Sequence, residues 1–242
     1  MYINLDLNEI RVAKDNTHHL YKDKPIYTKR FKHVLKYHPP GLAPVLDKTG
    51  AYHIDTMGEP AYDNRFLKTF GFYFLKAAVI TKDGWTHINP SGEEIYPTKY
   101  AWTGNYQDDV CTVRNFEGFY FHIDSLGNRL YAENMIYAGD FRDGIAVIRK
   151  QNGLCTHIFR NGNNVHKKFF IDLDVYHKGY ARARDRNGWF HINKEGNRIY
   201  DRYFSNIEPF YNGFALVEDL NGNKLIINEN GDVVHKLVGD IK

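Results

Sequence analysis

The chain has 242 residues, of which 43% are hydrophobic and 15% aromatic, so it is long enough to bury a sizeable core. Its 32 Lys and Arg residues nearly balance its 29 Asp and Glu residues, and a formal net charge of +3 argues against a nucleic-acid-binding surface. Two cysteines, Cys111 and Cys155, are too few for a disulfide framework and are expected to be buried thiols.

The N-terminus contains no basic start followed by an apolar run, which a secretory signal would need. The sequence also lacks any run of about 18 uncharged apolar residues that could form a membrane helix. We therefore expect a soluble, cytoplasmic protein that does not engage a membrane. Export by a route without a cleavable signal leaves no trace in a sequence and stays open.

Two markers recur along the chain at a nearly fixed interval of 34 or 35 residues. The first marker is a histidine, replaced by isoleucine in the last repeat, at His18, His53, His87, His122, His157, His191 and Ile226. The second is an aromatic residue or histidine that closes each repeat, at Tyr27, Tyr62, Tyr96, Tyr131, His166, Tyr200 and His235. The spacing predicts a single repeat domain over 1–242, with a degenerate unit at 1–26, six units of 34–35 residues at 27–235 and a tail at 236–242.

The last repeat illustrates the elements expected within one unit. An apolar segment at 213–217 leads to the turn residues Asn221 and Gly222, and a second apolar segment follows at 224–227. Another glycine-containing turn precedes a short segment at 233–234. Turns this frequent exclude helical repeats and predict a three-stranded antiparallel meander, followed by a connector that holds a fourth short strand or a turn.

A unit of this size cannot bury both faces of its sheet alone, so neighbouring units must pack on one another. The sequence predicts an all-β fold of about six to seven units with three to four strands each, closed as a β-propeller-like ring. In such a ring the degenerate N-terminal unit would pair with the last unit around Leu225–Asn228. The alternative is an open β-solenoid.

The repeated pattern resembles a known family. Gly-x-Ala-x-Val is followed by Asp-Gly-Trp-x-His-Ile-Asn/Asp-x-x-Gly and then Tyr, which is similar to the bacterial WG-repeat family over roughly Tyr27 to His235. The match is to a divergent branch, since Thr86 follows Trp85 and histidines stand where the family usually has an aromatic. The resemblance implies a scaffold for binding without catalytic residues. It also implies, by association only, a methyltransferase-type enzyme as a fused or cooperating partner.

The repeated histidines are candidates for a structural role. An imidazole that bonds to a neighbouring turn or backbone carbonyl would stabilise every unit in the same way. The alternative, a channel lined by histidines that bind metal, is the less favoured interpretation, so we expect no metal and no cofactor. Trp85 and Trp189 are expected in the core between units.

Functional residues are sought where a unit departs from the shared pattern, because such residues have no common structural duty. Trp102 and Tyr137 lie in connectors, which display function in many scaffolds. The remaining polar or aromatic candidates lie in the connectors and first strands of the later units: Asp140, Arg142, Asp174, His177, Arg182, Arg184, Glu208 and Tyr211.

Because side chains alternate between the two faces of a strand, the candidates Arg182 and Arg184 are expected on the same face. Ala181 and Ala183 are expected to point inward, so that Arg182 and Arg184 point outward together and could bind a carboxylate or phosphate. The alternative is a salt bridge between adjacent units, such as Arg182 with Asp174. If equivalent connectors gather on one rim, the carboxylates of Asp140, Asp174 and Glu208 would come together.

These observations favour a non-enzymatic binding module that recognises a protein partner, or a polar small ligand such as a sugar or nucleotide, through connector loops on one rim. The alternative is a hydrolase or lyase whose acid and base come from Asp140, Asp174, His177 or Glu208. Carboxylates from different units can form such a pair without leaving a linear motif.

Overall fold

A computed structural model describes residues 5–237 of the chain. Within this range the backbone forms one short 3-10 helix, η1 (Leu7–Glu9), and seven small sheets whose strands all pair antiparallel. The prediction of an all-β repeat protein is confirmed. No helix in the described part of the chain is long and apolar enough to cross a membrane.

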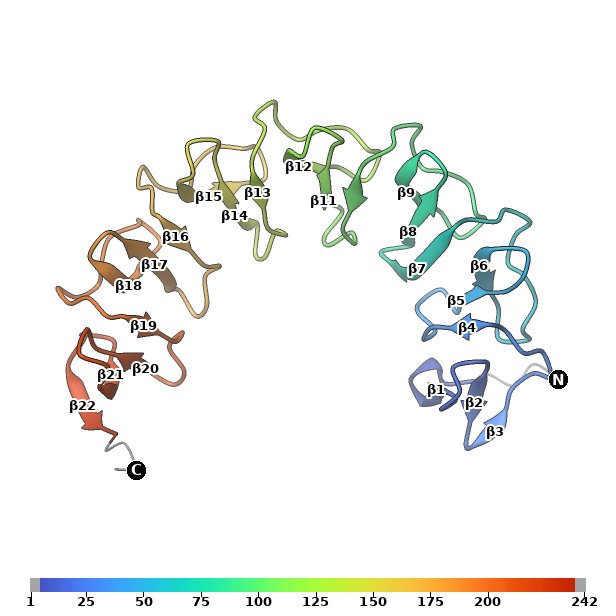
Figure 1. Ribbon diagram of the computed structural model, residues 1–242, viewed down its shortest axis with the longest axis horizontal. Helices are drawn as coiled ribbons and strands as arrows, with labels where there is room; N and C mark the ends of the chain where they lie inside the picture. Colours follow the sequence, from blue (N-terminus) through green and yellow to red (C-terminus); the bar gives the residue numbers. More distant parts are fainter. Residues whose placement is uncertain (1–4, 238–242) are drawn as a thin grey trace. The chain divides into compact units, whose positions relative to one another are not determined.

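The chain divides into two compact units, residues 1–129 and 130–242. The first unit contains four of the sheets found in the described residues, which follow one another in chain order (Figure 1). Sheets 1 to 4 are built, three strands each, from β1 (Ile10–Val12), β2 (His19–Tyr21) and β3 (Lys24–Pro25); β4 (His33–Val34), β5 (Ala43–Leu46) and β6 (Ala51–Ile54); β7 (Lys68–Tyr73), β8 (Lys76–Thr81) and β9 (Gly84–Ile88); and β10 (Trp102–Thr103), β11 (Cys111–Arg114) and β12 (Tyr120–Ile123).

The second unit contains the other three sheets of the part that is described. Sheets 5 to 7 are built from β13 (Tyr137–Ala138), β14 (Ile145–Arg149) and β15 (Cys155–Phe159); β16 (Asp172–Leu173), β17 (Ala181–Asp185) and β18 (Gly188–Ile192); and β19 (Asn206–Ile207), β20 (Phe214–Glu218), β21 (Lys224–Asn228) and β22 (Val233–Lys236).

A tight hairpin, here called the first hairpin, joins the first two strands of each of sheets 3 to 7. Its two central residues both have positive φ, as at Asn212 (51°) and Gly213 (82°). Positive φ at both positions defines a type I′ turn, whose twist matches that of the flanking strands. The other first hairpins place the same conformation at 74–75, 108–109, 143–144 and 178–179.

The connectors carry the chain from one sheet to the next. Tyr100 exchanges two backbone hydrogen bonds with Trp85 at the edge of sheet 3, and β10 of sheet 4 begins two residues later. Equivalent bridges join Phe66 to Ala51, Phe170 to Cys155 and Phe204 to Trp189. Each such connector therefore adds a fourth, minimal strand to its sheet, as the sequence predicted.

The turn after the third strand explains the Asn/Asp-x-x-Gly part of the repeat. The Asn89 side-chain oxygen accepts hydrogen bonds from the backbone N–H groups of Ser91 and Glu93 at 3.0 and 3.1 Å. Gly92 follows with φ +79°, and a Cβ there would lie 2.4 Å from Cγ of Tyr62. Since Tyr62 closes the preceding repeat, the glycine lets the turn pack directly on its neighbour.

The core of each unit lies where successive sheets face one another. The small-residue strand is buried, with Ala77 and Val79 fully shielded, and the aromatic Phe72 and the Ile88 side chain pack in the same cluster. Cys111 and Cys155 are both buried and free, as expected. Small side chains on the second strand allow the aromatic residues of adjacent repeats to fill the space.

Two details of the predicted repeat are wrong. Residues 224–228 do not offer an edge for the N-terminal repeat, because β20 and β22 pair with both sides of β21. In the first repeat the buried histidine is His19, whereas His18 is partly exposed and contacts Thr17. That repeat is one residue shorter between histidine and closing tyrosine, which shifted its apparent register. Closure of the array as a ring stays a prediction.

Candidate functional site

The repeated histidines form a buried clamp between adjacent sheets. His87 is fully buried at the end of sheet 3, and its Nε2 lies 3.0 Å from the backbone oxygen of Gly104 in the first-strand segment of sheet 4. Its Nδ1 is hydrogen-bonded to the hydroxyl of Tyr96, nine residues later. The ring also packs on Tyr106, with centroids 4.7 Å apart.

These contacts determine the tautomer of the imidazole. A carbonyl oxygen can only accept, so Nε2–H of His87 donates to Gly104 and the unprotonated Nδ1 accepts from the Tyr96 hydroxyl. Burial lowers the pKa of His87 to about 4, because the charged form would lose its hydration. The ring is therefore neutral at physiological pH and every polar atom on it is paired.

The same clamp recurs in both units. The accepting oxygens belong to Leu35, Phe70, Gly104, Asp174 and Glu208, opposite His19, His53, His87, His157 and His191 respectively. In sheet 5 the closing residue is His166, whose Nε2 lies 3.0 Å from Nδ1 of His157. Because the His157 Nδ1 must accept, His166 donates through Nε2, and its own Nδ1 accepts from the backbone N–H of Lys168.

The clamp agrees with the structural interpretation of the histidines, since each Nε2 named above is paired with a backbone carbonyl of the next sheet. No group of three or more His, Cys, Asp or Glu residues is arranged to hold a metal ion within residues 5–237. Trp85 and Trp189 are half-buried rather than enclosed, and Trp85 stacks on Phe70 at 5.1 Å.

Arg182 joins two sheets. Its Nε and Nη2 atoms contact Asp174 Oδ2, and its Nη1 donates to the backbone oxygen of Ile207 at 2.7 Å. Asp174 lies in the same sheet, whereas Ile207 is in β19 of the next one. The expected alternation holds, because Ala181 and Ala183 are buried while Arg182 and Arg184 lie on the opposite face. The guanidinium of Arg182 is engaged within the protein, but its salt bridge with Asp174 lies within one sheet rather than between adjacent units, and the contact with the next sheet is the hydrogen bond to Ile207.

Asp174 and Glu208 occupy equivalent positions directly after β16 and β19, whereas Asp140 lies one residue further on, after Gly139, which holds that position in sheet 5. Asp140 and Glu208 are exposed and Asp174 is half-buried beside Arg182. The backbone oxygens of Asp174 and Glu208 accept the histidine clamps of sheets 5 and 6. These positions are thus tied to the fold through their backbone, while their side chains differ. An acid-base role for Asp174 would require its release from Arg182.

His177 and Tyr211 lie together in the second unit. His177 begins the first hairpin of sheet 6, Tyr211 begins that of sheet 7, and their rings are 4.9 Å apart. The Nε2 atom of His177 is buried without a hydrogen-bond partner, while Tyr211 is 57% exposed. The Tyr211 ring therefore packs against the imidazole of His177 and leaves much of its surface exposed to solvent.

The remaining candidates are spread over the two units. Trp102 is half-buried in β10 and packs near Tyr120 at 6.2 Å in the first unit. Tyr137 in β13 is half-exposed, and Arg142 begins the first hairpin of sheet 5. Arg142 lines a cavity of about 190 Å³, which is smaller than the usual 300–1,000 Å³ of a small-ligand pocket.

First hairpins of neighbouring sheets lie side by side within each unit. In the second unit His177 touches Tyr211, and the cavity beside Arg142 is also lined by Lys178 of the next hairpin. In the first unit Lys76 approaches Asp109 at 3.7 Å. The hairpins thus form a row of tips in each unit, here called the hairpin row, whose side chains differ from repeat to repeat.

The sequence reasoning missed the most unusual of these hairpins. Phe74 and Leu75 are the central residues of the first hairpin of sheet 3, with φ of 50° and 58°, and their side chains are 55% and 56% exposed. The first hairpins of sheets 4 to 7 use Asp, Asn, Lys or Gly at these positions. Bulky residues with positive φ are strained and rare. The sequence does contain a signal for this tip, because Phe74-Leu75 stands at the turn position that Asn212-Gly213 holds in the last repeat.

Comparison with known families and structures bears mainly on the fold. Residues 189–223 match the sequence profile described as WG containing repeat, which supports a WG-repeat assignment. No curated protein sequence matches the chain.

Solved structures resemble the chain at low identity. The crystal structure of a eukaryotic initiation factor is similar with a TM-score of 0.53 and 10% identity over 87% of this chain and 66% of that one. BamB from Moraxella catarrhalis matches with a TM-score of 0.47 and 13% identity over 97% and 86% of the two chains. The WD40 β-propeller domain of Doa1 matches with a TM-score of 0.35 and 12% identity over 71% of this chain and 68% of that one. At these identities the likeness concerns the fold alone.

Proposed function

We propose that this chain is a non-enzymatic binding module that recognises a protein partner through its hairpin rows. The observation that carries the proposal is the Phe74–Leu75 tip. Two large apolar side chains stay exposed there, in a turn conformation that other repeats form with polar residues or glycine. A fold with no use for them would gain stability by replacing them. Exposed apolar and aromatic side chains on a rigid element are typical anchors of protein interfaces.

The hairpin row of the second unit offers more polar contacts. Tyr211, supported by His177, supplies an aromatic face, and the charged candidates beside the hairpins would set specificity. We propose as contact residues the exposed candidates next to the hairpin tips: Asp140, Arg142, Glu208 and Tyr211. Tyr137 and Arg184 are also exposed but lie at the other end of their strands, and we propose them as flanking contacts. Asp174 and Arg182 are proposed to position this surface by joining sheets 6 and 7.

The proposal is tested by exchanging the tip for the one that sheet 7 uses. The double variant Phe74→Asn, Leu75→Gly keeps the type I′ turn and removes the apolar anchor. Wild type and variant serve as baits in lysate of cells that make the protein, with quantitative mass spectrometry of the captured proteins. Leu126→Asn is the matched control, since Leu126 is 69% exposed in a turn outside the hairpin row.

We expect at least one protein to be retained by wild type and by the control and to be reduced tenfold or more by the tip variant. That protein, once purified, should show the same ranking by isothermal titration calorimetry. Equal capture by all three baits would rule out the hairpin tip as the binding element.

A further inference from the structure

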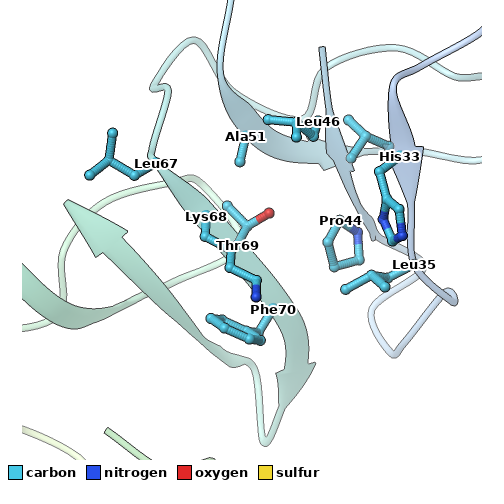
Figure 2. Close-up of a pocket in the computed structure, with 10 residues that line it drawn as sticks. His33, Leu35, Pro44, Leu46, Ala51, Leu67, Lys68, Thr69 and Phe70 are labelled. Carbon is cyan, nitrogen blue, oxygen red and sulfur yellow. The ribbon is translucent and has the colours of Figure 1, made fainter. Parts of the chain in front are cut away.

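An apolar cleft lies between sheets 2 and 3 of the first unit. Its volume is about 520 Å³, which is within the range of ligand pockets. Figure 2 shows Leu35, His33 and Pro44 on the side of sheet 2, with Thr69 and Phe70 on the facing strand β7. Leu46 and Leu67 also line the cleft and are 37% and 67% exposed. The cleft thus has an apolar floor and exposed leucines around it.

The backbone along this cleft is largely paired already. The N–H of Leu35 donates to Pro44, and its oxygen accepts from His19. On the other side the Leu67 N–H donates to Ile80, and the Phe70 oxygen accepts from His53. An occupant therefore has few backbone groups with which to add a strand, and its binding must rest on side chains inserted between the sheets.

The charged side chain that lines the cleft is basic. It belongs to Lys68, and none of the described lining residues is a carboxylate. The Lys68 ammonium lies 5.0 Å from the Phe70 ring, so it stands over the apolar floor. Exposed Lys32 and Lys36 flank the first strand of sheet 2. An anionic group beside an apolar one is complementary to this arrangement.

A second, more polar cavity of about 760 Å³ adjoins the cleft at Leu67, which lines both. Three basic residues line this second cavity, namely Arg65, Lys82 and Lys99, against the two acids Asp83 and Glu94. Glu94 is paired with Lys99 at 2.6 Å. Basic side chains outnumber acidic ones over the two cavities taken together, and two adjoining cavities suit a chain-like occupant better than a single small molecule.

We propose that this cleft binds a segment of a partner protein in which a large apolar side chain is flanked by carboxylates. The apolar side chain enters between Leu35 and Phe70, the carboxylates contact Lys68 and the basic residues beyond Leu67, and Leu46 and Leu67 are covered by the flanking residues. This site lies on different residues from the hairpin rows and does not depend on them.

The test starts from a phage-displayed library of random dodecapeptides selected on the 242-residue chain. The recovered peptides are synthesised with fluorescein and their Kd is measured by fluorescence anisotropy. The variants are Leu67→Asp and Lys68→Glu, both at exposed side chains. Leu126→Asp and Lys167→Glu are the matched controls, since both side chains are exposed and line neither cavity. Circular dichroism melting establishes that each variant is folded.

We expect recovered peptides that carry Leu, Phe or Trp beside Asp or Glu. Their Kd should rise tenfold or more for Leu67→Asp and for Lys68→Glu and stay within twofold for the controls. Exchanging the acidic residues of the peptide for lysine should abolish binding to wild type and partly restore it with Lys68→Glu.

Three outcomes would overturn the proposal. One is that no peptide is recovered above background, and another is that the recovered peptides lack the acidic and apolar pattern. The third is equal binding to Leu67→Asp and wild type. Sodium octanoate is measured in parallel by NMR line broadening, and its binding without any recovered peptide would assign the cleft to a free carboxylic acid instead.

Discussion

The histidine clamp and the hairpin row occupy neighbouring parts of the same sheets but follow opposite rules. In the clamp the same atoms meet in repeat after repeat, and even the exchange of tyrosine for His166 keeps the donor and acceptor pattern. In the hairpin row the backbone turn is kept while the side chains change from Asp108-Asp109 to Phe74-Leu75. Residues that recur in every repeat therefore hold the sheets together, whereas residues that differ between repeats are the candidates for binding a partner.

The largest expected effect tests the clamp as a whole through pH. Burial lowers the pKa of His53, His87, His157 and His191 from 6.5 to about 4. Between pH 6.5 and 4 these histidines are protonated in the unfolded chain but not in the folded protein. The free energy of unfolding is therefore highest above about pH 6.5 and falls as the pH drops towards 4. Each such shift lowers the free energy of unfolding by roughly 3 kcal/mol once the pH is below about 4.

Calorimetric Tm values at pH 7.5, 6.5, 5.5 and 4.5 test this expectation. The Tm should change little between the first two and then fall steeply. A Tm that is constant down to pH 4.5 would mean that these imidazoles are not held neutral in the folded protein.

One clamp alone is tested by His87→Ala. The substitution leaves the Tyr96 hydroxyl and the Gly104 oxygen without their buried partner and opens a cavity beside Tyr106. We expect a loss of about 4 kcal/mol in the free energy of unfolding, measured by urea denaturation. His33→Ala, at an exposed position, should change it by less than about 0.5 kcal/mol. Similar losses for both variants would remove the distinction between clamp and surface.

The contact between successive repeats is tested at a pair of glycines with similar backbone. Gly92 (φ +79°) would place a Cβ 2.4 Å from Tyr62, whereas Gly118 (φ +91°) has no atom within 4 Å of that position. Alanine at Gly118 should cost about 1 kcal/mol for the φ alone, and alanine at Gly92 about 3 kcal/mol. Equal losses in urea denaturation would show that Tyr62 moves aside at no cost.

The smallest expected effect has the opposite sign and concerns the hairpin row. The variant Phe74→Asn, Leu75→Gly relieves positive φ at two bulky residues, so it should raise the free energy of unfolding by about 1 kcal/mol. Urea denaturation measures this, with Asn212→Phe, Gly213→Leu as the reciprocal change that should destabilise sheet 7. A loss of stability in the first variant would mean that the apolar tip is needed for packing rather than for a partner.

Much of the fold could be predicted because its signals are local and repeated. The alternation of Ala181 and Ala183 with the arginines, and the Asn-Gly turns, depend on residues a few positions apart. The prediction failed in the first repeat, where it assigned the repeated histidine to His18. This repeat has one residue fewer between the buried histidine, His19, and its closing tyrosine, so the regular spacing pointed one residue too early. The pairing assigned to residues 225–228 failed because the strand after them, β22, took the free edge. For the candidate residues, alternation predicted the exposed face but not that Arg182 reaches Ile207 in the next sheet.

The sequence by itself determined the repeat length and the strand character of each unit, and it predicted a structural role for the repeated histidines. These follow from periodic patterns, which report on short-range geometry. Only the tertiary structure decided which atoms complete each clamp, how Arg182 joins two sheets, and that Leu35 and Phe70 enclose a cleft beside Lys68. Such contacts join residues of different sheets, and their positions depend on how the sheets pack rather than on the pattern of any one segment.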